Sequence, residues 1–96
     1  MPRWQRNAEW GVVDRPKDGE HGGVLFAASL TEGLIHRVEG PAAVVARAAL
    51  RGEGLTVIRR SCASELGVPE DDVDELALAE LLEDLVTLGL LHKATG

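Results

Sequence analysis

The spacing of hydrophobic positions changes near residue 40. Before that point, short runs rich in Val, Leu, Ile and Gly alternate with turn residues. This pattern predicts strands over residues 10–14, 24–28 and 34–38. After it, Ala, Leu and Glu dominate with helical spacing. Strands followed by helices favour an α+β domain.

Three helices are expected in the second part of the chain. The first spans 41–50, because proline suits the first position of a helix, where its missing N–H costs nothing. The second spans 57–66, with Thr56 as its N-cap. The third spans 69–88, and its acidic first turns favour the positive end of the helix dipole. A glycine follows each helix within two residues, as is common at helix C-termini.

The third predicted helix has more apolar surface than one buried stripe requires. An amphipathic helix usually needs an apolar stripe somewhat over 100° wide. Here two stripes lie side by side, one of them Val73, Ala77, Leu81, Leu85 and Leu88, the other Leu78, Leu82 and Val86. Either both pack in a wide core contact, or one lines an exposed groove that binds a peptide.

The length of 96 residues is enough for one small domain with one core. We expect this domain to span residues 10–92, with a flexible lead-in over 1–9 and a tail over 93–96. No apolar run reaches the roughly 18 residues that cross a membrane. The polar N-terminus lacks the apolar stretch of a signal peptide, so the expected location is cytoplasmic, without membrane association.

Patterns that carry catalysis or bind metal are missing from the sequence. His21, His36 and His92 fall in a predicted turn, strand and tail, without the i, i+4 spacing of a helical metal site. The single cysteine, Cys62, is expected to be a small core residue. No phosphate-binding glycine loop or nucleophile elbow occurs. We therefore expect a protein that is not an enzyme and that needs no cofactor and no metal.

The charge is unevenly distributed along the chain. The net charge is −6, with +2 over residues 1–63 and −8 over residues 64–96. An acidic third helix argues against nucleic-acid binding, which needs clustered positive charge. One observation keeps a winged-helix DNA-binding protein as an alternative, namely the arginines of the first two helices, Arg47, Arg51, Arg59 and Arg60.

Four segments together resemble a known family. They are GGVLF at 22–26, GLIHRV at 33–38, RGEGLT at 51–56 and LLEDLVTLGLL at 81–91. Their order resembles that of the PqqD-like family, also called RiPP recognition elements, over residues 10–92. The resemblance implies a winged-helix-like fold with a three-stranded antiparallel sheet followed by three helices. It also implies binding of the leader of a ribosomally made precursor peptide.

In that family the leader adds as a strand to the third strand and lies against the third helix. Carried over to this sequence, the resemblance nominates Leu34, Ile35, His36, Arg37 and Val38 on the strand, and Asp74, Leu78, Leu81, Leu82 and Leu85 on the helix. It implies delivery of the precursor peptide to a modifying enzyme such as a radical-SAM enzyme, a cyclase or a peptidase.

Two further expectations follow from the third helix. Its surplus leucines allow a homodimer as another use of its apolar surface. Its acidic start predicts that a bound peptide has basic residues near Asp71, Asp74 or Glu75, with an affinity that falls as salt rises.

Overall fold

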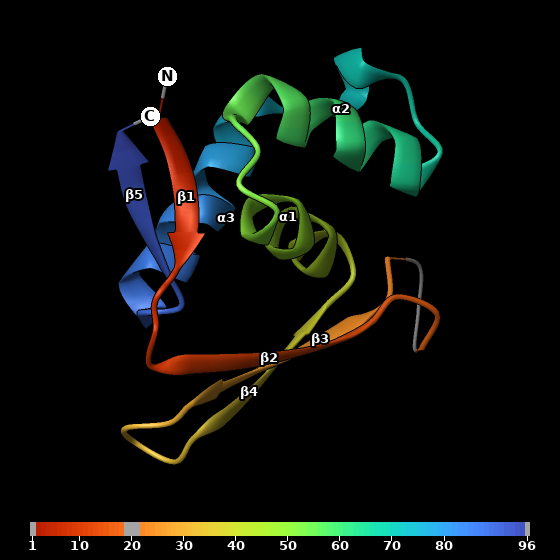
Figure 1. The fold of residues 1–96 in the computed structure, drawn as a ribbon. Coiled ribbons are helices and arrows are strands. Elements are labelled where there is room, and N and C mark those ends of the chain that lie inside the picture. The colour runs from red at the N-terminus through yellow and green to blue at the C-terminus, as the bar shows by residue number, and fades with distance from the viewer. Residues whose placement is uncertain (1, 19–21, 96) are drawn as a thin grey trace.

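A computed structural model describes residues 2–18 and 22–95 (Figure 1). The strands are β1 (Pro2–Arg6), β2 (Trp10–Arg15), β3 (Val24–Ser29), β4 (Ile35–Glu39) and β5 (Leu91–Thr95). The helices are α1 (Pro41–Leu50), α2 (Leu55–Leu66) and α3 (Glu75–Leu88), with a short 3-10 helix η1 (Glu70–Asp72) before α3. The predicted α+β class, with a three-stranded antiparallel sheet and three helices, is confirmed.

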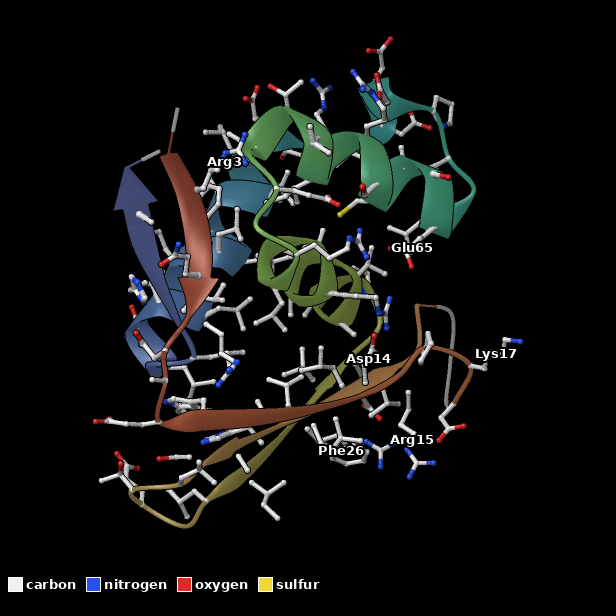
Figure 2. The ribbon with its side chains drawn as sticks, viewed as in Figure 1. Arg3, Asp14, Arg15, Lys17, Phe26 and Glu65 are labelled. Carbon is white, nitrogen blue, oxygen red and sulfur yellow. The ribbon has the colours of Figure 1, made fainter. Side chains whose placement is uncertain are left out.

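The three-stranded sheet has the order β2-β3-β4, so β2 and β4 are its two edges. The strand register places Val12 beside Ala27 and Ala27 beside His36 on one face. This face packs on the helices and is called the inner face below. The other face, called the outer face, carries Phe26 and its neighbours and points away from the helices (Figure 2).

Helix α1 lies at the centre of the molecule, between the sheet and the other two helices (Figure 1). Gly40 precedes it with φ 62°, a left-handed conformation that glycine adopts without strain, and Pro41 occupies the first turn. Six of its ten residues are buried, namely Ala43, Val44, Val45, Ala46, Ala48 and Ala49. These small side chains let the neighbouring elements approach closely.

The predicted helix over 69–88 is two elements, which corrects the sequence analysis. Pro69 precedes η1, Val73 is extended, and α3 begins only at Glu75. The carboxylate of Asp74 accepts a hydrogen bond from the Leu76 amide at 3.0 Å, which makes Asp74 the N-cap. Helix α2 likewise begins at Leu55, before the expected Thr56 cap, with Gly54 as its N-cap.

Strands β1 and β5 form a second sheet that the sequence analysis did not expect. They pair antiparallel from Pro2 beside Thr95 to Arg6 beside Leu91. This corrects the flexible lead-in expected over 1–9 and the tail expected over 93–96, of which only Met1 and Gly96 lie outside the described residues. Trp4 of β1 is 4% exposed and belongs to the core.

Arg47, a residue of α1, forms hydrogen bonds both to the sheet and to α2. Its guanidinium donates to the Asp14 carboxylate at 2.7 Å, to Glu65 on α2 at 3.1 Å and to the Gly22 carbonyl at 3.1 Å. The side chain is only 11% exposed. The hydrogen bond to Asp14 raises the pKa of the guanidinium above its ordinary value. Figure 2 shows Asp14 pointing from β2 toward α1.

We predict that Arg47→Met lowers the free energy of unfolding by about 2 kcal/mol, because it removes a largely buried guanidinium that holds three elements together and leaves the Asp14 and Glu65 carboxylates, 34% and 36% exposed, without their partner. The matched control is Arg15→Met. Arg15 pairs with Asp18 at 3.9 Å, and both side chains are 60% exposed, so the expected loss is about 0.5 kcal/mol or less. Urea unfolding measures both values, and equal losses would contradict the connecting role of Arg47.

Candidate functional site

Among the described residues, β4 has a strand partner on one side only, so its other edge has backbone groups that are not paired with a strand. The Ser29 amide donates to the Leu34 carbonyl, and the Gly40 amide donates to the Gly23 carbonyl. In an antiparallel pair, hydrogen-bonded and non-hydrogen-bonded residues alternate. The residues between Leu34 and Gly40 whose amides and carbonyls point away from β3 are therefore Ile35, Arg37 and Glu39. An extended peptide can add to the sheet along these three residues.

The side chains of β4 divide between the two faces of the sheet. His36 and Val38 are half-buried on the inner face, where the His36 ring lies 5.6 Å from the Trp10 ring. Ile35 and Arg37 are on the outer face, and Ile35 is 73% exposed. The Arg37 guanidinium lies over the Phe26 ring, 5.8 Å from its centre. Leu34, the remaining strand residue predicted from the sequence, precedes β4 and is exposed.

An apolar cleft of about 130 Å³ lies among the three helices, beginning where β4 ends. Pro41, two residues after the last β4 residue, forms part of its wall. The cleft is lined by Pro41 and Val45 of α1, Cys62 and Leu66 of α2, and Val73, Asp74, Ala77, Leu78 and Leu81 of the α3 segment. Asp74 is the one charged residue among them.

The structure brings together three of the five helix residues predicted from the sequence. Asp74, Leu78 and Leu81 line the cleft. Leu82 and Leu85 are 1% and 7% exposed and pack in the core, which Leu78 also joins at 3% exposed. Leu85 belongs to one apolar stripe of α3, and Leu78 and Leu82 belong to the other, so both stripes contribute to the core.

The contributions of α1 and α2 to the cleft were missed by the sequence analysis. Pro41 and Val45 are four residues apart, as are Cys62 and Leu66, so each pair lies on one face of its helix. This spacing was visible in the sequence. It does not by itself indicate a cleft, because buried core residues show the same spacing.

Negative charge surrounds the start of α3. Asp71, Asp72, Asp74 and Glu75 are exposed, and within residues 2–18 and 22–95 none of them forms an ion pair. One carboxylate oxygen of Asp74 accepts the hydrogen bond that caps α3, and the same residue lines the cleft. An apolar cleft with acidic residues at its margin can accommodate a ligand in which an apolar side chain lies next to a positively charged one.

The Cys62 thiol on the cleft wall is 2% exposed. Burial is the main cause that raises its pKa from 9.0 to about 11, and the nearby carboxylates of Glu65 and Glu53 add to the shift. The thiol is therefore protonated at neutral pH, which fits a packing role rather than a nucleophile.

We predict that iodoacetamide alkylates Cys62 of the folded protein at pH 8 at least tenfold more slowly than the unfolded chain in urea. A free thiol with a pKa of about 8.5 is partly ionised at this pH, whereas a thiol with a raised pKa is not. Mass spectrometry of timed samples measures both rates. Equal rates would contradict both the burial and the direction of the pKa shift.

The arginines that supported the DNA-binding alternative are engaged within the protein. Arg47 pairs with Asp14 and Glu65, Arg51 pairs with Glu53 at 2.7 Å, and Arg60 pairs with Glu70 at 3.2 Å. The remaining member, Arg59, donates to the Val73 carbonyl. Four arginines thus face carboxylates or a carbonyl rather than forming one positive patch.

Histidine, cysteine and acidic side chains do not gather into a cation site. Across residues 2–18 and 22–95, no group of three or more of them is placed to hold a metal ion. His21, one of the three histidines considered from the sequence, lies outside these residues. In the same part of the chain, no helix has the length and apolar character needed to cross a membrane.

Comparison with known proteins gives one informative match. No protein-family model and no curated protein sequence matches the chain. A solved structure described as lasso peptide synthetase B1 complexed with the leader peptide matches with a TM-score of 0.69 and 19% sequence identity. The match covers 94% of this chain and 98% of that one. The chain therefore shares its fold, over almost its whole length, with a protein solved together with a leader peptide.

Proposed function

We propose that this protein binds the leader segment of a ribosomally made precursor peptide and delivers it to a modifying enzyme. The observation that carries the proposal is the free edge of β4 running into an apolar cleft. The fold shared with lasso peptide synthetase B1, solved with a leader peptide, supports it. The resemblance to RiPP recognition elements in the sequence agrees with it.

Binding needs three kinds of contact, each provided by a different part of the site. Backbone groups of Ile35, Arg37 and Glu39 pair with the added strand, which gives affinity with little dependence on sequence. The cleft takes an apolar side chain of the leader, which sets the register. Asp74 and its acidic neighbours attract a basic residue beside that side chain.

The proposed activity is binding without catalysis. A leader held on β4 places the attached segment of the precursor near an enzyme that also binds this protein, which raises its local concentration. The site needs no metal and no cofactor for this role. Candidate enzymes are a radical-SAM enzyme, a cyclase or a peptidase, and neighbouring genes would indicate which.

The backbone contribution of β4 can be tested with Arg37→Pro. Proline removes one outward amide and keeps the hydrogen bonds to β3, because edge strands tolerate proline on their free side. We expect the affinity of the Arg37→Pro variant for the leader of the precursor encoded beside this gene to fall about tenfold or more. A tenfold loss corresponds to about 1.4 kcal/mol of binding free energy.

Arg37→Ala is the matched control, since it removes the same side chain and keeps the amide. Fluorescence anisotropy of a labelled leader gives both dissociation constants, and circular dichroism checks the fold. Equal losses in the two variants would rule out strand addition at this edge. Binding of duplex DNA at low salt, with none of the leader, would favour the DNA-binding alternative.

The charge at the cleft can be tested separately from helix capping. Asp74→Asn keeps an oxygen that accepts the Leu76 amide and removes the negative charge, whereas Asp74→Ala removes both. We expect Asp74→Asn to weaken leader binding several-fold at 50 mM salt and to flatten its salt dependence. Its thermal stability should stay near that of the wild type. Unchanged salt dependence would show that the acidic residues serve only helix capping and solubility.

A further inference from the structure

The outer face of the three-stranded sheet forms a small apolar surface rimmed by charge. The strand register aligns its residues in three rows. The rows are Gly11, Ala28 and Ile35; then Val13, Phe26 and Arg37; then Arg15, Val24 and Glu39. Val24 is 1% exposed, so the exposed apolar surface comes from the first two rows. Figure 2 shows Phe26 on this face, on the side of the sheet opposite the helices.

The exposed large apolar side chains concentrate on this sheet. Val13 is 54% exposed and Ile35 is 73% exposed on the outer face. Leu30 and Leu34, at 71% and 52%, occupy the turn that joins β3 to β4. The others in the described residues are Val57, Val68 and Leu76, which lie apart from one another along the helical half.

Gly11 is the one residue in the three rows that has no side chain. It lies inside β2, where glycine costs stability relative to other residues. Its φ is not positive, and a Cβ added there would meet nothing within 4 Å. The fold of this chain therefore does not require glycine at this position. A glycine inside a strand often marks close approach by another chain, and Gly11 and Ala28 leave room for a side chain beside Ile35.

The size of the face indicates what kind of partner it suits. Three strands about 4.8 Å apart and five residues long, at about 3.4 Å per residue, present on the order of 240 Å². A stable complex buries about 800 Å² on each partner. The face alone is too small for a permanent dimer of this chain, and it suits a transient contact.

The face is continuous with the proposed leader strand. A peptide added along β4 becomes the fourth strand of the same sheet, and alternate side chains of the peptide point outward beside Ile35 and Arg37. The added strand widens the apolar face by about one third. A protein that covers this wider surface contacts both this protein, here called the carrier, and the bound leader peptide.

We propose that the outer face of the sheet docks the enzyme that modifies the precursor peptide. This inference rests on the proposed function. The matching surface on the enzyme is a small apolar patch with a side chain that packs against Gly11 between its neighbours on the sheet. Because the leader contributes part of the surface, the enzyme binds the loaded carrier more tightly than the empty one. By linkage, the enzyme raises the affinity for the leader by the same factor.

The test uses the precursor peptide and the maturation enzyme encoded with it. Gly11→Lys and Val13→Lys place a charge on the outer face, two strands away from the edge that binds the leader. Both positions have room for the longer side chain. Val57→Lys is the matched control, because Val57 is 42% exposed on α2, away from the sheet. Gly11→Ala adds only a methyl group.

We expect Gly11→Lys and Val13→Lys to bind the labelled leader within about twofold of the wild type. Their carrier-dependent rate of precursor modification, measured as kcat/KM, should fall about tenfold or more. Val57→Lys and Gly11→Ala should keep both values. Unchanged modification rates in both lysine variants overturn the docking proposal.

Two other outcomes identify a different failure. If the wild-type protein binds no leader, the proposed function is wrong, and the docking proposal falls with it. If sedimentation shows a wild-type dimer that Gly11→Lys converts to a monomer, the outer face binds a second copy, and docking of an enzyme there is overturned.

Discussion

The burial of α1 on nearly all sides is the constraint on which the rest of the structure depends. It contacts β1, β3 and β4 as well as α2 and α3. Elements can surround a helix this closely only when its side chains are small, and here four of the six buried ones are alanines. Helix α1 thereby sets the distance between the sheet and the other helices. Because Pro41 and Val45 are in its first two turns, the same helix joins the β4 edge to the cleft.

The site is built almost entirely from backbone groups and apolar surface. A strand edge binds many sequences, and a cleft of this size selects one apolar side chain with limited discrimination. Such a site suits a carrier that holds a flexible segment without changing it. The arginines of α1 and α2, which could have made a different kind of site, are instead paired within the protein, and Arg47 joins β2, α1 and α2.

Local signals in the sequence identified the elements whose ends are marked by glycine and proline. Strands β3 and β4 and helix α1 match the prediction to within one residue at each end. The pairing of β1 with β5 could not be found in this way, because its partners lie at opposite ends of the chain. The start of α3 was placed too early, because the predicted helix ignored the competition of the Asp74 side chain for backbone amides.

The candidate site was accessible to prediction only in part. Asp74, Leu78 and Leu81 were named from the resemblance and do lie on the cleft. Leu82 and Leu85 belong to different apolar stripes of α3, yet both face the core, so burial on this helix does not follow one stripe and periodicity alone cannot assign it. The walls from α1 and α2 depend on how helices cross, which the spacing within one helix does not encode.

The β1–β5 pair has a consequence for how this unit can be combined with others. Pro2 and Thr95 are direct partners, so the first and last described residues lie side by side (Figure 1). Segments joined to the two ends of this unit would therefore meet it at neighbouring points on its surface. Units with adjacent ends can be inserted into a surface loop of a host protein without stretching it. The geometry therefore suits a module that works either separately or as an insertion in a longer chain.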